Sequence, residues 1–203
     1  GIMAILAACG LIYEYLLSHY AGRILGVVES TIYAMIGLMI VSMGVGSFAA
    51  KLLKDPFTSF AWLEALIALV GVTCILIIAL AVSASAILPD VIAEVFNLPP
   101  DLVPSGGMLI TLHNIAFFSP YIFGALIGFL IGMEIPLIAR VREAVYGEHL
   151  EHNTGTIYGA DYIGAGVGAA IWVLVMLSLE ISKAAVFTAI VNLLAGLAFL
   201  FFY

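Results

Sequence analysis

Apolar runs of about twenty residues constrain this chain more than any other feature. Glu14 is the one aspartate, glutamate, lysine or arginine in residues 2–21, and residues 30–50 contain none. A helix needs about 20 mainly apolar residues to cross the roughly 30 Å hydrocarbon core of a bilayer. Because such runs recur along the chain, the sequence predicts an all-α integral membrane protein.

The composition leaves no room for a large water-soluble part. The chain is 65% hydrophobic and 9% charged, with a mean hydropathy of +1.24, whereas soluble domains are about 25% charged. We therefore expect residues 1–203 to form one transmembrane domain, a bundle of about six helices. The chain starts at Gly1 rather than Met and stops at Tyr203 within an apolar run, which predicts a piece of a longer protein.

The limits of the spans follow from charges and prolines. Residues 102–133 are uncharged and exceed one span, so we divide this run at Ser119-Pro120, where a serine can cap a helix and a proline can occupy its first turn. Residues 89–118 then become a long connection. The expected spans are 2–21, 30–50, 59–88, 120–141, 156–179 and 182–203.

The positions of lysine and arginine predict the orientation, because short loops rich in these residues stay in the cytoplasm. Lys51 and Lys54 follow the second span, and Arg140 and Arg142 follow the fourth. The connection 89–118 contains acids but no lysine or arginine, and two further bases on its side of the membrane each have an acid nearby. This pattern predicts that both termini are cytoplasmic and that 89–118 faces outward from a bacterial or archaeal cytoplasmic membrane.

With this topology the first three helices run opposite to the last three, as in an inverted 3+3 repeat. Two short motifs occur in both halves. Thr-Ile-Tyr at 31–33 precedes Gly-Val-Gly at 44–46, and the same tripeptides occur at 156–158 and 166–168. Because the spacing between the motifs differs by three residues between the halves, the repeat is a hypothesis to be tested by the fold.

Four carboxylates inside the expected spans are the main candidates for function. Each costs roughly 2–3 kcal/mol or more to insert and must be paired or must line a wet cavity. We interpret Glu14, Glu134 and Asp161 as parts of a cation or proton site, and Glu64, closer to the membrane surface, as a further candidate. The alternative is that these acids are protonated or hydrogen-bonded and only hold helices together.

A proline supports the choice of Glu134. Pro136 lacks an N–H and therefore frees the carbonyl oxygen four residues earlier, that of Gly132. A freed carbonyl beside a carboxylate suits a cation. The candidate cation- or substrate-binding set is Glu14, Glu64, Gly132, Glu134 and Asp161.

Small residues predict where helices approach closely. Gly124, Gly128 and Gly132 lie on one stripe, and Ala160, Gly164 and Gly168 lie on another. Such stripes let helix backbones pack closely. We expect the two stripes to face each other, which would bring Glu134 and Asp161 to a similar depth.

Several chemistries find no support in the sequence. His149 and His152 lie in a polar loop that we expect to be solvated rather than metal-bound, and Cys9 and Cys74 lie in apolar helices where no disulfide is expected. There is no catalytic triad, cofactor motif or basic patch for nucleic acid. We therefore expect no catalytic residue, metal or cofactor in this chain.

Four ordered motifs resemble a known family. They are Cys-Gly-Leu-Ile-Tyr-Glu at 9–14, Ser-Met-Gly-Val-Gly-Ser at 42–47, Gly-Met-Glu-Ile-Pro-Leu at 132–137 and Asp-Tyr-Ile-Gly at 161–164. Together they resemble the membrane domain of spermidine synthase-like proteins, the polyamine aminopropyltransferases. The resemblance implies a cytoplasmic aminopropyltransferase domain of Rossmann-like fold after the membrane helices, which would transfer an aminopropyl group from decarboxylated S-adenosylmethionine to putrescine.

Three functions remain open from the sequence. The first is a membrane domain whose acidic interior binds or passes polyamines or other cations, since spaced carboxylates complement a polycation. The second is a structural anchor for the transferase, and the third is a small proton-coupled transporter. The expected partners are the lipid bilayer, a polyamine or other cation, a C-terminal cytoplasmic transferase domain, and a second copy of the chain in a homodimer.

Overall fold

A computed structural model describes residues 1–99, 102, 104, 106–147 and 150–202, and in these residues every regular element is a helix. Six segments are long and apolar enough to cross a membrane, which confirms the predicted all-α membrane fold. His149 and the side chain of His152 lie outside the described part. The elements are α1 (Ile2–Leu25), α2 (Val28–Ala49), η1 (Ala50–Leu52), α3 (Pro56–Val95), α4 (Met108–Gly132), α5 (Glu134–Tyr146), α6 (Leu150–Leu174), η2 (Met176–Ser178) and α7 (Ile181–Phe202).

Helix α1 forms the centre of the bundle. It packs against α6, α2 and α7, and Leu6, Tyr13, Leu16 and Leu17 are almost completely buried. The opposite pattern occurs in α2, where only four of the 22 residues are buried and large apolar side chains such as Tyr33, Val41 and Phe48 are exposed. Exposed apolar side chains on a membrane helix face lipid, so α2 lies at the periphery of the bundle.

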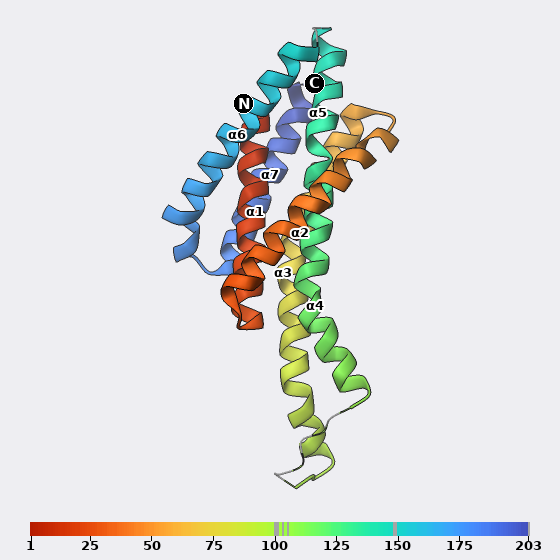
Figure 1. Ribbon diagram of the computed structural model, residues 1–203, viewed down its shortest axis with the longest axis vertical. Coiled ribbons are helices and arrows are strands. Elements are labelled where there is room, and N and C mark those ends of the chain that lie inside the picture. The colour runs from red at the N-terminus through yellow and green to blue at the C-terminus, as the bar shows by residue number, and fades with distance from the viewer. Residues whose placement is uncertain (100–101, 103, 105, 148–149, 203) are drawn as a thin grey trace.

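Both chain ends lie at the same end of the molecule, together with the α2–α3 and α5–α6 connections (Figure 1). Arg140 of α5 fastens the α2–α3 turn by donating hydrogen bonds to the carbonyl oxygens of Leu53 (2.6 Å) and Lys54 (2.8 Å). The structure therefore gathers Lys51, Lys54, Arg140 and Arg142 at the end that also holds the termini.

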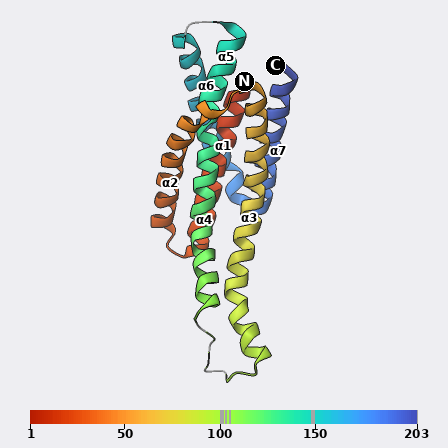
Figure 2. The same cartoon turned by 90° about the vertical axis from the view of Figure 1, so that its right-hand side faces the viewer.

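The third and fourth spans are longer than expected. Helix α3 has 40 residues, about 60 Å at 1.5 Å per residue, roughly twice the hydrocarbon thickness. Its second half and the start of α4 lie side by side and project beyond the other helices (Figures 1 and 2). The expected connection 89–118 is therefore wrong in extent, because it includes the last turns of α3 and the first turns of α4.

Two prolines explain this error. Pro89 lies inside α3 and Pro120 lies inside α4, whereas the sequence pattern predicts the start of a loop at Pro89 and the first turn of a new helix at Pro120. Membrane helices tolerate proline in their interior because neighbouring groups satisfy the freed backbone atoms. A proline in an apolar run is therefore a weaker boundary than in a soluble protein.

Four of the helix contacts are paired as an inverted 3+3 repeat would require. Helix α1 runs away from the end with the termini and α4 runs toward it (Figure 1). In such a repeat the α1–α6 contact corresponds to α4–α2, and the α3–α4 contact corresponds to α7–α1, and all four are extensive here. Gly46 and Gly168 end the two copies of the Gly-Val-Gly motif, and they make corresponding contacts. Gly46 packs on the backbone of Phe129 in α4, and Gly168 packs on the backbone of Ala8 in α1.

Candidate cation-binding cavity

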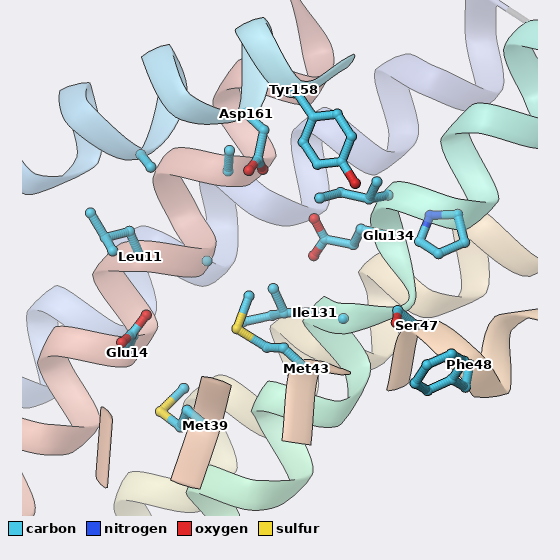
Figure 3. A pocket seen from close by; sticks show the side chains of 16 residues that line it. Leu11, Glu14, Met39, Met43, Ser47, Phe48, Ile131, Glu134, Tyr158 and Asp161 are labelled. Carbon is cyan, nitrogen blue, oxygen red and sulfur yellow. The ribbon is translucent and has the colours of Figure 1, made fainter. Parts of the chain in front are cut away.

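A cavity of about 420 Å³ lies among α1, α2, α4, α5 and α6. It is lined by carboxyl groups from three helices, those of Glu14 in α1, Glu134 in α5 and Asp161 in α6 (Figure 3). Gly132 also lines it. The volume lies within the range of small-molecule sites, roughly 300–1,000 Å³. The structure thus brings four of the five candidate residues to one place.

A break between α4 and α5 positions Glu134. Helix α4 ends at Gly132, Met133 forms a turn, and α5 begins at Glu134. Pro136 has no N–H with which to continue the helical ladder to the carbonyl of Gly132, which is a physical cause for the break. Glu134 consequently lies in the first turn of α5, where the helix dipole favours a negative charge.

The electrostatic surroundings of Glu134 are acidic. Its side chain is 2% exposed, and its Oε1 has no hydrogen-bond partner among the described residues. Glu64 and Asp161 lie close enough to Glu134 for their charges to interact. No lysine or arginine belongs to the described lining of the cavity. A proton or an incoming cation must therefore neutralise this negative charge.

Glu64 lies behind the cavity rather than in its wall. It is fully buried between α3 and α7, where its Oε2 accepts a hydrogen bond from Asn192 Nδ2 at 3.0 Å. Because α7 covers this turn of α3, the side chain of Glu64 is not exposed to lipid. The hydroxyl of Tyr13 is also buried and has no partner in the described chain, whereas Tyr162 is 72% exposed.

The two glycine stripes mediate close packing, but they do not face each other. Gly128 and Gly132 lie against the backbone of Met39 and Met43 in α2. On the other side of the bundle, Gly164 lies against the backbone of Ala4 in α1. The expected contact between the stripes is therefore wrong, and Glu134 and Asp161 line the same cavity because α5 and α6 both border it.

Sequence reasoning missed some of the polar residues at this site. Tyr158 and Ser47 line the cavity, and Asn192 binds Glu64. Tyr158 could have been found because it lies three residues before Asp161, on the same face of a helix. Asn192 is an isolated amide in an apolar span, and an intramembrane polar group of this kind needs a partner on another helix.

Comparisons with known proteins give a consistent set of bacterial relatives. The chain is 61% identical over 200 residues to a polyamine aminopropyltransferase of Shewanella oneidensis, which covers 98% of this chain and 35% of the relative. It is 29% identical over 192 residues to polyamine aminopropyltransferase 1 of Streptomyces coelicolor, covering 94% and 31%. A polyamine aminopropyltransferase of Oceanobacillus iheyensis is 25% identical over 201 residues, covering 98% and 34%.

The relatives are much longer than this chain, which spans about a third of their length. No protein-family model and no solved structure matches the chain. The similarity nevertheless extends over nearly all of its residues, including every helix of the cavity. The chain is thus an integral membrane region homologous to part of the polyamine aminopropyltransferases.

Proposed function

We propose that this chain is the membrane domain of an aminopropyltransferase and that its acidic cavity binds a polyamine or a similar organic cation. One observation carries the proposal: three carboxyl groups from three helices line one cavity, and Glu134 Oε1 is buried there without a partner in the described chain. A protonated amine would supply both the missing donor and the missing positive charge.

The names of the relatives favour a polyamine over other cations. Those proteins are named polyamine aminopropyltransferases, and a flexible polycation suits carboxylates that are spread around a cavity. Ammonium groups would bind the carboxyl groups of Glu14, Glu134 and Asp161, while the methylene chain would contact the apolar side chains of the cavity wall, such as Met39, Met43 and Ile131. The proposal is for binding, and passage of the cation across the bilayer is a separate question.

The membrane domain would also carry the transferase. The relatives extend beyond this chain by about two thirds of their length, which leaves room for a catalytic domain. The bases gathered at the end that holds both termini support a cytoplasmic location for that end. A transferase domain attached there would reach the cytoplasm, and the cavity would hold polyamine close to it.

A structural anchor is the second candidate. The fraction of the relatives that lies outside this chain favours it, because an anchor needs only the six spans. In that case the cavity carboxyl groups would be protonated and would serve helix packing alone. The anchor and the binding domain differ in one measurable property, which is affinity for polyamine.

Equilibrium dialysis of radiolabelled spermidine against the purified chain in nanodiscs tests the proposal. We expect the wild-type chain to bind spermidine and the Glu134→Gln variant to lose about 10- to 100-fold in affinity, the value of a charged hydrogen bond of roughly 1.5–3 kcal/mol. Glu143→Gln, an exposed position on the same helix, is the matched control and should bind as the wild type does. Absence of binding by the wild type would support the anchor instead, and equal affinity in the Glu134→Gln variant would show that spermidine does not bind at Glu134.

A further inference from the structure

The interface between α3 and α7 contains a buried acid–amide pair. Asn192 Nδ2 donates one hydrogen bond to Glu64 Oε2 at 3.0 Å and another to the backbone oxygen of Glu64 at 3.1 Å. Both side chains are at most 1% exposed. Gly196 makes room for the pair, because a Cβ at this position would lie 2.8 Å from Cβ of Glu64. The small residue at position 196 therefore allows α7 to pack closely against α3 at Glu64.

Hydrogen-bond accounting leaves two oxygen atoms of the pair unsatisfied. Glu64 Oε1 and Asn192 Oδ1 are both buried and have no partner among the described residues. Asn192 has used both of its N–H donors on Glu64, and an ionised carboxylate has no hydrogen to donate. Glu64 Oε1 and Asn192 Oδ1 are therefore two acceptors with no donor, and one additional hydrogen atom is needed. A proton on Glu64 Oε1 would satisfy both oxygens at once.

The surroundings offer no other way to balance a charge on Glu64. Helix α7 presents the neutral amide of Asn192. Of the two arginines of α5, Arg140 is bound to backbone oxygens of the α2–α3 turn, and Arg142 lies over the ring of Tyr146, 5.2 Å from its centroid. The titratable groups that interact with Glu64 in the described chain are acids or neutral at pH 7, namely Cys9 and Tyr13 of α1 and Glu134 of α5.

We propose that Glu64 and Asn192 form a proton-binding site inside the bundle. The carboxyl group of Glu64 holds the proton on Oε1 and donates it in a hydrogen bond to Asn192 Oδ1, while Oε2 accepts from Asn192 Nδ2. The result is a neutral acid–amide pair joined by two hydrogen bonds. Glu64 then adds no negative charge beside Glu134, so Glu134 is the member of this neighbouring pair that is available to bind a cation.

The site can be tested without any cation, so its failure is distinguishable from failure of the proposed polyamine binding. Infrared difference spectroscopy of the chain at pH 7 compares the wild type with Glu64→Gln. Glutamine has the shape of the protonated acid, and its amide can donate to Asn192 Oδ1 and accept from Asn192 Nδ2. We expect the variant to lose a carboxylic-acid C=O stretching band while the carboxylate bands stay unchanged.

A stability measurement gives the second readout. The Glu64→Gln variant should melt within about 2 °C of the wild type because both hydrogen bonds are retained, whereas Asn192→Leu should melt several degrees lower because it leaves Glu64 buried without its partner. Loss of carboxylate bands in Glu64→Gln would show that Glu64 is ionised and would overturn the proposal. Failure of Glu64→Gln to fold would contradict it as well, since the glutamine should replace a protonated acid without loss.

Discussion

Glu134 in α5 and Asp161 in α6 line the same cavity, and Glu134 Oε1 is buried there without a hydrogen-bond partner in the described chain. Two carboxyl groups in one poorly hydrated place repel each other when both are ionised. A bound cation removes this repulsion, and a bound proton removes it as well. The competition between these two ligands is the physical basis of the proposed site.

The packing of α6 on α1 predicts different effects at two glycines of one helix. Gly164 lies against the backbone of Ala4, whereas a Cβ at Gly166 would meet nothing within 4 Å. We expect Gly164→Ala to destabilise the fold by about 1–3 kcal/mol, since a backbone neighbour cannot move aside as a side chain can. The melting temperature in detergent should fall by roughly 2–4 °C for each kcal/mol.

The matched control is Gly166→Ala, two residues further along α6. It should leave the melting temperature unchanged or slightly higher, because alanine is a better helix former than glycine. If the two variants melted at the same temperature, the close contact between α6 and α1 would be wrong.

The spans could be read from the sequence because each needs only a long apolar run, which hydropathy detects. The ends of α3 and α4 could not, since Pro89 and Pro120 mark boundaries in soluble proteins but lie inside helices here. A stripe of glycines likewise predicts that another helix packs closely against it, but it does not identify which helix. The prediction that Gly164 is a packing position is therefore correct, but its neighbour is the backbone of Ala4 in α1 and not the stripe of α4.

The candidate site could be predicted in part for a similar reason. The cost of an intramembrane carboxyl group singles out Glu14, Glu134 and Asp161 without knowledge of the fold, and these three line the cavity. The pair of Glu64 with Asn192 joins residues 128 positions apart. Nothing local in the sequence connects them, so this contact required the structure.

The start of α3 predicts a pH-dependent contribution to stability. Hydrogen bonds from the side chain of Thr58 and from the backbone N–H groups of Phe57 and Thr58 lower the pKa of Asp55 below its ordinary value of 3.8. A lowered pKa stabilises the folded state above the ordinary value, and this contribution is lost as the pH falls through the pKa of the folded state. Asp55 caps the helix by accepting from Phe57 N at 3.1 Å.

Thermal melts at pH 7 and at pH 3 check this contribution. Asp55→Ala should melt below the wild type at pH 7, and the difference should shrink at pH 3. Asp55→Asn keeps a capping oxygen and should stay close to the wild type at pH 7. A difference between wild type and Asp55→Ala that was the same at both pH values would show that the charge of Asp55 has no part in the cap.

Impermeant thiol labelling of intact cells tests the orientation. Lys54 and Glu94 are exposed and lie at opposite ends of α3, and both native cysteines are buried, which keeps the background low. We expect Glu94→Cys to react in intact cells and Lys54→Cys to react only after lysis. The reverse pattern would place the termini outside and would exclude a cytoplasmic domain attached at that end.

Calorimetric titration of spermidine into the wild-type chain, in two buffers of different ionisation enthalpy at the same pH, tests the cavity most directly. If the amine replaces a proton held by the carboxyl groups, the observed heat will differ between the buffers, and affinity will weaken as the pH falls. The Glu134→Gln variant should bind about 10- to 100-fold more weakly and should lose the buffer difference. Equal heats in the two buffers, with an affinity that the Glu134→Gln change leaves unaltered, would contradict exchange of a proton for a cation at Glu134.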